Sequence, residues 1–380
     1  MGSGVGSGVG SGVGSGRCGG SGGSGGSGAG SGESGESGVG SGAESGESGV
    51  GSGASGAGTF GARLNMLVPV YDIKNCGPRH RFVANGKLVH NSDKLNLQNL
   101  PSRGGNTLKS AIIPPAGHLV IDCDSSQIEA RVLAWVAGQM DLVRAFASGE
   151  DVYKIMASKI FIKPVDEITE QERFLGKTTI LGCGFGMGAE RFQAQLNNVG
   201  VVLELESCQN IIATYRSSYE RVAGLWKQAQ RCLEALWVGQ VAPIGVREDA
   251  VYLGLEGFTL PSGFILRYPD LQKDTGGQFS YKARNARTKI YGGKVVENLI
   301  QAVARCVIAE QMVWISAKYR PVLTVHDSVT IVAPLAEAEE AAQWVRKCMS
   351  KSPVWARGLP LACKSSFGEN YGQGLMHGDN

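Results

Sequence analysis

Two aspartates lie where an apolar segment of the chain gives way to another element. Asp124 ends the apolar run HLVIDCD, residues 118–124, which predicts a short strand. Asp327 lies at the bend of PVLTVHDSVTIVAP, residues 321–334, which predicts two strands joined by a tight turn. Carboxylates are hard oxygen ligands that suit Mg²⁺, and a pair of such ions about 3.5–4 Å apart serves nucleotidyl transfer. The two aspartates are therefore candidates for a two-metal site.

Each aspartate also has an ordinary structural explanation. The amphipathic pattern SQIEARVLAWVAG follows Asp124 directly and predicts a helix. Taken alone, Asp124 and Ser126 are more simply helix caps, with Ser126 and Glu129 forming a capping box. An aspartate in a hairpin turn such as Asp327 is equally ordinary turn chemistry.

A second candidate group is the series Arg173, Lys177, Leu181 and Phe185, spaced by four residues. On a helix this spacing keeps side chains on one slowly drifting face. Such a face presents two cations, an apolar surface and an aromatic ring in order, which suits a triphosphate followed by a base pair. A solvated basic stripe on an ordinary helix explains the arginine and lysine alone equally simply.

Together these motifs resemble the family A (polymerase I-like) DNA polymerases. The segment DSSQIEARVLAW, which begins at Asp124, is similar to motif A of that family. The resemblance implies that Asp124 binds both metals and that the backbone carbonyl of Ser125 binds one of them. It further implies that Glu129 lies beneath the incoming sugar and excludes a ribose 2′-hydroxyl.

The series that begins at Arg173 resembles motif B of the same family, the helix of the fingers. The resemblance implies that Arg173 and Lys177 bind phosphates and that Phe185 lies next to the templating base. Leu181 stands where the family usually has Phe or Tyr. The resemblance therefore implies nothing about how this chain treats 3′-modified nucleotides.

The segment Thr324–Ser328 resembles motif C, in which Asp327 is the second metal-binding aspartate and His326 lies near the primer terminus. Ser328 replaces the usual Glu, so a hydroxyl stands in place of a carboxylate.

Two further likenesses concern DNA. The LQNLP segment implies that Gln98 and Asn99 lie along primer and template, and ENLIQ implies that Gln301 touches the duplex minor groove. A polar residue on a core helix explains Gln301 equally well.

The elements that position these residues predict an α+β fold. The patterns indicate mainly helices over residues 152–237, a hairpin over 257–269 and a long helix over 294–315, with a closing helix near 337–349. No βαβ repeat is present, which argues against a doubly wound sheet. The resemblance implies a polymerase palm, an antiparallel sheet with packed helices, and helical fingers near 151–293, together forming residues 92–380.

Residues 59–91 carry a different chemistry. Short strands are predicted within 67–90, and the segment ends in His90, Asn91 and Ser92. The Asn91 side chain can close a succinimide and cut the following bond while His90 donates a proton, and Ser92 offers a nucleophile. The spacing of these motifs resembles the C-terminal blocks of an intein, which implies supporting roles for Asp72 and His80. We expect a short β-rich intein segment, either half of a split intein or part of a truncated gene.

Residues 1–58 consist almost entirely of Gly, Ser, Val, Ala and Glu and offer no large side chain to bury, which predicts a disordered tail. This tail has one arginine against four glutamates, a net charge of −3. Because the whole chain carries +3, residues 59–380 carry +6. A mildly basic remainder is compatible with a phosphate-bearing partner but does not establish one.

The functional prediction is a template-directed DNA polymerase that uses two Mg²⁺ ions, with primer-template DNA and dNTPs as partners. A further expected partner is an N-terminal polymerase half that carries the complementary intein fragment. The alternatives are a catalytically silent DNA- or nucleotide-binding fragment and a chain whose main activity is splicing. Nine scattered cysteines without metal-ligand spacing indicate a reducing compartment, and no membrane span is expected. We therefore expect a cytoplasmic location, in the bacterial host if a phage encodes the chain.

Overall fold

The computed structural model describes residues 81–84, 87–90, 107–283 and 286–371 of the 380-residue chain. All of them lie in the second of the two units into which the chain divides, Gly77–Asn380. The predictions for the tail, and those for six site residues, fall outside the described residues. These six residues are Asp72, His80, Asn91, Ser92, Gln98 and Asn99.

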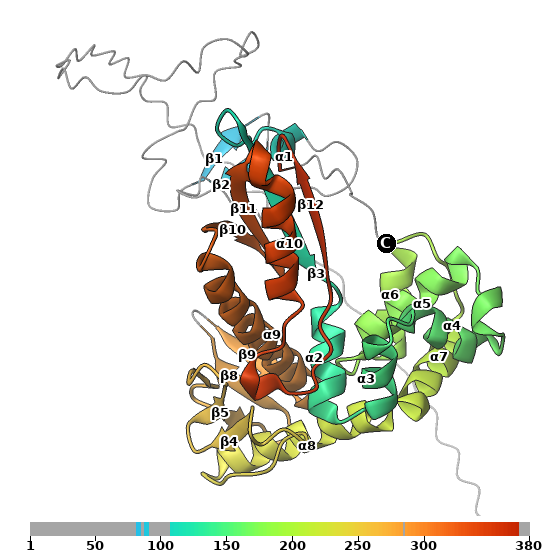
Figure 1. Cartoon of the computed structure of the whole chain (residues 1–380). Helices are drawn as coiled ribbons and strands as arrows, with labels where there is room; N and C mark the ends of the chain where they lie inside the picture. The colour runs from blue at the N-terminus through green and yellow to red at the C-terminus, as the bar shows by residue number, and fades with distance from the viewer. Residues whose placement is uncertain (1–80, 85–86, 91–106, 284–285, 372–380) are drawn as a thin grey trace, which may run out of the picture. The chain divides into compact units, whose positions relative to one another are not determined.

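A four-stranded antiparallel sheet, in the upper part of Figure 1, is the largest sheet of the described residues. Its order is β10 (Pro321–Val325), β11 (Ser328–Pro334), β3 (His118–Ser125) and β12 (Cys363–Gly368). The predicted strands at 118–124 and 321–334 are thereby confirmed. Side chains alternate along β3, so Ile121 and Cys123 are buried on one face while Asp122 and Asp124 share the other.

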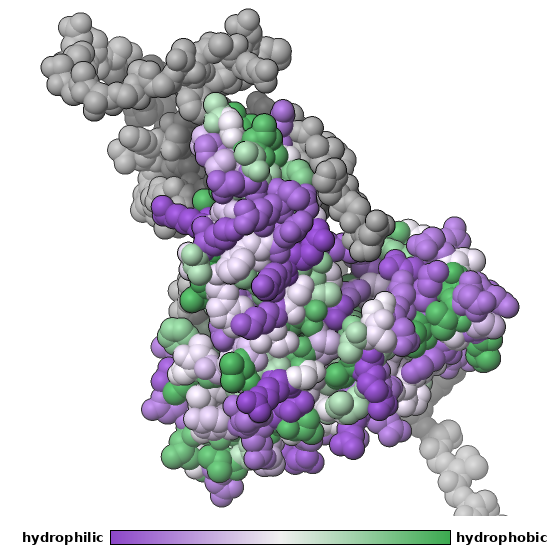
Figure 2. Space-filling view, in the orientation of Figure 1, coloured by the Kyte–Doolittle hydropathy of each residue, from purple (hydrophilic) through white to green (hydrophobic). Residues whose placement is uncertain are grey.

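Helix α10 (Ala338–Met349) covers the buried face of this sheet and packs against β3 and β12 (Figure 1). Its inward positions include Ala341, Val345 and Met349, all fully buried. Its outer positions are mostly charged, and the corresponding surface is strongly hydrophilic in Figure 2. This separation is what an amphipathic helix on a sheet requires, and it confirms the predicted closing helix.

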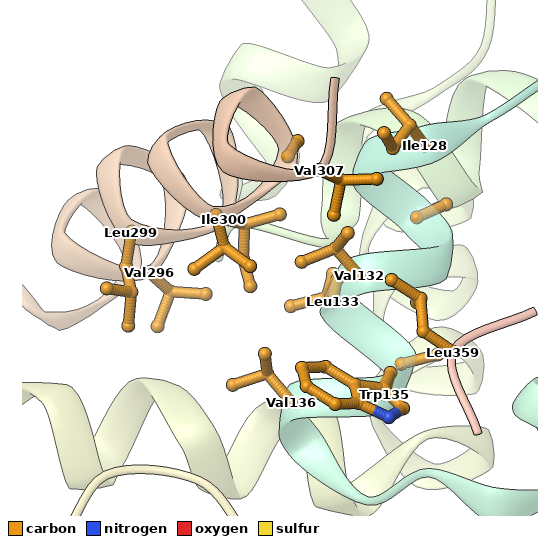
Figure 3. Packing of buried hydrophobic residues seen from close by; sticks show 14 of the residues in the cluster. Ile128, Val132, Leu133, Trp135, Val136, Val296, Leu299, Ile300, Val307 and Leu359 are labelled. Atoms are coloured by element: carbon orange, nitrogen blue, oxygen red, sulfur yellow. The ribbon is translucent and has the colours of Figure 1, made fainter. Parts of the chain in front are cut away.

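The long helix α9 (Gly292–Ser316) packs against α2 (Ile128–Ala137) in the centre of the core. Figure 3 shows Val296, Ile300 and Val307 of α9 directed towards Val132 and Val136 of α2. These five side chains are fully buried, so the contact between the two helices is a principal part of the hydrophobic core.

Helix α9 is long and apolar enough to cross a membrane by length and composition alone. Its apolar side chains pack on α2, α8 (Glu220–Trp237) and α10, which is the pattern of a core helix. Among the described helices no other meets that test.

A group of helices forms the second part of the unit and confirms the helical prediction for residues 152–237 (Figure 1). Helix α4 packs closely on α5, where a Cβ at Gly176 would lie 2.2 Å from the carbonyl oxygen of Tyr153. The helices are α3 (Met140–Ala147), α4 (Val152–Phe161), α5 (Glu170–Cys183), α6 (Ala189–Asn197), α7 (Leu205–Ser218) and α8 (Glu220–Trp237).

Small antiparallel sheets complete the described structure, which is α+β as predicted. The expected hairpin at 257–269 is present as β5 paired with β6, and β1 pairs with β2 through Ala84 and Lys87. The remaining elements are β1 (Arg81–Ala84), β2 (Lys87–His90), α1 (Thr107–Ser110), β4 (Tyr252–Gly254), β5 (Gly257–Thr259), β6 (Ile265–Leu266), β7 (Gln272–Lys273), β8 (Phe279–Lys282) and β9 (Arg287–Ile290).

Candidate active site

The C-terminal end of β3 and the turn between β10 and β11 meet at one end of the four-stranded sheet. Asp124 lies opposite Ser328 in the register of β3 and β11. The Ser125 N–H donates to the carbonyl oxygen of Asp327 over 3.2 Å, and His326 adopts a left-handed conformation with φ 53° that makes the turn tight. The fold therefore brings Asp124 and Asp327, which are far apart in the chain, to one place.

The two carboxyl groups influence each other strongly. Partial burial, together with the neighbouring charges of Asp327 and Asp122, raises the pKa of Asp124 to about 6. Burial also raises the pKa of Asp327, and the Asp124 and Asp327 side chains are close enough for their charges to interact. Like charges this close disfavour the doubly ionised state, and a bound cation would remove that penalty.

The donor set fits a hard divalent cation. Two carboxylates and the adjoining carbonyl of Ser125 are oxygen ligands of the kind Mg²⁺ prefers. Among the described residues no group of three or more His, Cys, Asp or Glu side chains is arranged to hold a metal. The coordination of a metal ion at this site would therefore be completed by other oxygen ligands, such as those of water or substrate.

The capping explanation for the start of α2 is wrong. The residue that precedes the helix is Gln127, in a left-handed conformation with φ 53°, and no side chain caps the helix at this end. Ser126 therefore does not form the expected capping box with Glu129. Non-glycine residues in this conformation are uncommon and concentrate at functional sites.

A buried arginine holds this turn in place. Arg131 is 6% exposed, and its Nε donates to the carbonyl oxygen of Ser126 over 2.8 Å. Its Nη1 donates to the carbonyl oxygens of both Phe146 and Pro360, each over 3.3 Å. Arg131 thus joins the residues after Asp124 to two other segments, a positioning role that the motif comparison left unassigned.

Several predicted residues line one cleft of about 440 Å³ beside Asp327. Glu129 on α2 and Gln301 on α9 both line it, and exposed His326 lies at its border. Burial raises the pKa of Glu129. Gln301 is exposed rather than part of the core, so the structure favours an accessible role for it. Arg305, one helical turn further along α9, also lines the cleft and was not predicted.

Arg173 and Lys177 lie on α5 as predicted, but in contact with α4. Arg173 Nε lies 2.6 Å from Asp151 Oδ2, and that aspartate also accepts from the N–H groups of Tyr153 and Lys154 at the start of α4. The Arg173 guanidinium and the Lys177 ammonium lie 5.5 and 5.9 Å from the centre of the Tyr153 ring. Both cations are therefore collected around one aromatic side chain.

Phe185 corrects the helical prediction in part. Helix α5 ends at Cys183, so Leu181 lies on the helix but Phe185 lies in the turn beyond it. Both residues line a hollow of about 280 Å³, which Glu297 also borders. Glycine is needed next to this turn, because a Cβ at Gly293 would lie 2.4 Å from the carbonyl oxygen of Phe185.

The sequence analysis overlooked Asp122, Arg131, Tyr153 and Arg305. Asp122 was detectable, because it lies two residues before Asp124 on one strand and so shares its face. Arg305 was also detectable, four residues after Gln301 on the same helix. Tyr153 had no comparable signal, since its place follows from the packing of α4 on α5.

Comparison with known proteins agrees with this arrangement. The model of the family described as "DNA polymerase family A" matches residues 80–373. The DNA polymerase of Bacillus phage SP02 is 27% identical over 280 residues, which cover 70% of this chain and 43% of the phage protein. The thermostable DNA polymerase I of Thermus aquaticus is 27% identical over 297 residues, 76% of this chain and 31% of that protein. The chain thus spans less than half the length of these relatives.

A solved structure shares the fold. The POL domain of Pol1 from M. smegmatis, in complex with DNA primer-template and dNTP, aligns with a TM-score of 0.50 at 21% identity. The alignment covers 73% of this chain and 44% of that one. Because the family model spans most of the residues described above, the chain belongs to the family A DNA polymerases.

Proposed function

We propose that this chain forms the catalytic region of a template-directed DNA polymerase, which adds dNTPs to the 3′-hydroxyl of a primer. The observation that carries the proposal is the meeting of Asp124 and Asp327 beside a cleft bordered by Glu129, Gln301 and His326. Membership of family A and the primer-template and dNTP bound to the M. smegmatis relative support it.

Asp124, Asp327 and the carbonyl of Ser125 would hold two Mg²⁺ ions. Such ions, when bound, activate the primer hydroxyl and stabilise the charge that develops on the transferring phosphoryl group. The chain itself fixes the geometry, because the Ser125 N–H to Asp327 carbonyl bond and the Arg131 contacts hold both ligand-bearing turns.

The other predicted residues contact different parts of the dNTP and the DNA. Arg173 and Lys177 bind the triphosphate, an exchange in which Arg173 gives up its partner Asp151 for phosphate oxygens. Glu129 lies beneath the sugar, Phe185 contacts the templating base and Leu181 adjoins it. Gln301 and His326 contact the primer terminus and the minor groove, and Gln98 and Asn99 lie along the DNA.

Binding and chemistry are tested separately. The unaltered chain and the Asp124→Ala and Asp327→Ala variants are titrated into a fluorescent primer-template, and DNA binding is measured by anisotropy. Primer extension is then measured after the chain is joined to its N-terminal half. We expect all three proteins to bind DNA and only the unaltered enzyme to extend the primer. Extension at a near-normal rate by either variant refutes the metal assignment.

The competing function is a silent DNA- or nucleotide-binding fragment. The juxtaposed carboxyl groups favour the catalytic function, since nucleic-acid binding alone gains nothing from two aspartates with raised pKa values. DNA binding without extension by the joined enzyme would establish the silent fragment instead.

We also propose that residues 59–91 are the C-terminal segment of an intein, which joins Ser92 to an N-terminal polymerase half. The sequence motif around Asp72, His80, His90 and Asn91 supports this, as does the antiparallel pairing of Arg81–Ala84 with Lys87–His90. The family match begins at residue 80 and so includes the last part of this segment.

The test mixes this chain with a partner that carries the complementary intein fragment. We expect a ligated product from the unaltered chain and none from Asn91→Ala. If neither protein gives a product, the splicing proposal fails while the polymerase proposal stands. A reducing cytoplasmic location accords with the seven free cysteines among the described residues.

A further inference from the structure

A third carboxylate shares the sheet face of the proposed metal site. Asp122 lies two residues before Asp124 on β3, with its side chain on the same face. At a rise of about 3.3–3.4 Å per residue, the two positions are about 7 Å apart. Asp122 is only partly exposed, and its charge is felt by Asp124.

A neighbouring hydroxyl group holds this carboxylate in place. Thr330, directly opposite Asp122 in the register with β11, donates its hydroxyl to Asp122 Oδ1 over 2.6 Å. Thr330 is 2% exposed, so the bond lies within the protein and is protected from competition by water. Ser328 lies two residues before Thr330 on β11 and so shares this sheet face.

The place of Asp122 relates directly to position 328. Ser328 lies opposite Asp124, and its hydroxyl donates to the carbonyl oxygen of Val325 over 3.1 Å. It brings no charge to the site, although motif C usually has a carboxylate at this position. Asp122 is the diagonal cross-strand neighbour of Ser328, within the reach at which side chains on one sheet face interact.

We propose that Asp122 is a positioning residue of the catalytic site, which supplies from β3 the negative charge that residue 328 does not supply from β11. Fixed by Thr330, its charge draws divalent cations to Asp124 and Asp327 and orders the water ligands between them. It does not itself ligate the metal. The inference rests on the proposed metal site.

The test measures Mn²⁺ binding to the full-length chain by electron paramagnetic resonance of the free ion, so that it does not depend on polymerase activity. Asp122→Asn keeps the shape of the side chain and its acceptor oxygen but removes the charge. We expect its affinity for Mn²⁺ to fall about tenfold, as loss of a unit charge about 7 Å from a partly screened cation implies. Asp166→Asn, which changes an exposed aspartate of the short 3-10 helix Val165–Glu167, is the matched control and should bind normally.

Two more variants test whether Asp122 supplies the negative charge that residue 328 lacks. Ser328→Glu in the Asp122→Asn background should restore most of the affinity, because it returns a carboxylate to the same sheet face. Thr330→Val, which keeps the charge of Asp122 but removes its anchor, should weaken binding about twofold to threefold. Thermal melting of each variant establishes that it is folded.

Normal Mn²⁺ binding by Asp122→Asn overturns this inference and leaves the proposed function intact. Weakened binding that Ser328→Glu fails to restore, in a variant that melts normally, overturns the relocation of the charge. An unaltered chain that binds no Mn²⁺ overturns the metal site and this inference together.

Discussion

The N–H of Ser125 donates to the carbonyl oxygen of Asp327 over 3.2 Å, and this bond ties the end of β3 to the turn between β10 and β11. Both metal-ligand candidates are thereby fixed by backbone geometry. Sites built on such rigid elements hold their side chains more accurately than sites on long loops. The cost is that two carboxyl groups are forced together, and this repulsion has measurable consequences.

Asp124→Asn should stabilise the protein in the absence of divalent cations. Because the folded state raises the pKa of Asp124 to about 6, the unaltered protein loses stability as pH rises from about 4 to about 6. The variant escapes this loss. Since Asp124 is solvent-accessible, screening reduces the gain to about 1 kcal/mol at pH 7.

Urea unfolding in EDTA at pH 4, 5, 6 and 7 measures this difference. The advantage of Asp124→Asn should be absent at pH 4 and complete above pH 6. An advantage that is the same at all four values would show that the raised pKa of Asp124, which burial and the neighbouring carboxylates cause, is not its source.

Arg131→Lys should lower the free energy of unfolding by about 2–3 kcal/mol, because lysine cannot reproduce the several directed bonds to buried carbonyls. The turn after Asp124 would lose its anchor, so Mn²⁺ binding should weaken as well. Urea unfolding and Mn²⁺ titration measure the two effects. Arg144→Lys, an exposed arginine on α3, is the control and should change neither quantity. A normal Mn²⁺ affinity in Arg131→Lys contradicts the positioning role.

Gly293→Ala should destabilise the protein by about 2 kcal/mol or more, because the added methyl group would lie 2.4 Å from a backbone oxygen of Phe185. The turn that carries Phe185 would have to move, so primer extension in the joined enzyme should fall too. Thermal melting and extension rates measure these effects. Gly224→Ala on α8 is the control, since a methyl group there meets nothing within 4 Å. Equal melting temperatures for the two variants would show that the turn at Phe185 can move aside without loss of stability.

Asp151→Ala should cost about 1–2 kcal/mol of stability, because Asp151 both caps α4 and pairs with Arg173. Asp151→Asn keeps an acceptor for the cap and loses only the charge, so its loss should be smaller. Urea unfolding compares them, and Asp166→Ala serves as a control for removing an exposed aspartate. Equal losses in Asp151→Ala and Asp151→Asn would assign the whole effect to the ion pair.

Local patterns predicted the elements that carry the site. Short apolar runs identified β3, β10 and β11, and longer apolar or amphipathic segments identified α9 and α2, because both patterns follow from which residues are buried. The motif comparison selected Asp124, Asp327, Glu129 and Gln301, and the structure places the last three along one cleft.

Local patterns failed where a conformation depends on contacts with distant segments. Ser126 and Glu129 have the sequence of a capping box, yet Gln127 takes a left-handed conformation because Arg131 and the sheet edge hold the turn. Phe185 continues the helical spacing, yet α5 ends before it, where Gly293 packs against the turn.

The sequence by itself determined which residues could ligate metal and which strands and helices carry them, since both follow from residue type and local periodicity. The tertiary structure alone decided that Asp124 and Asp327 share one end of the sheet, that Glu129 and Gln301 line one cleft and that Asp122 lies diagonally across from Ser328. These relationships join segments from opposite ends of the described region. They depend on strand register and helix packing, which are set by the whole core rather than by any one segment.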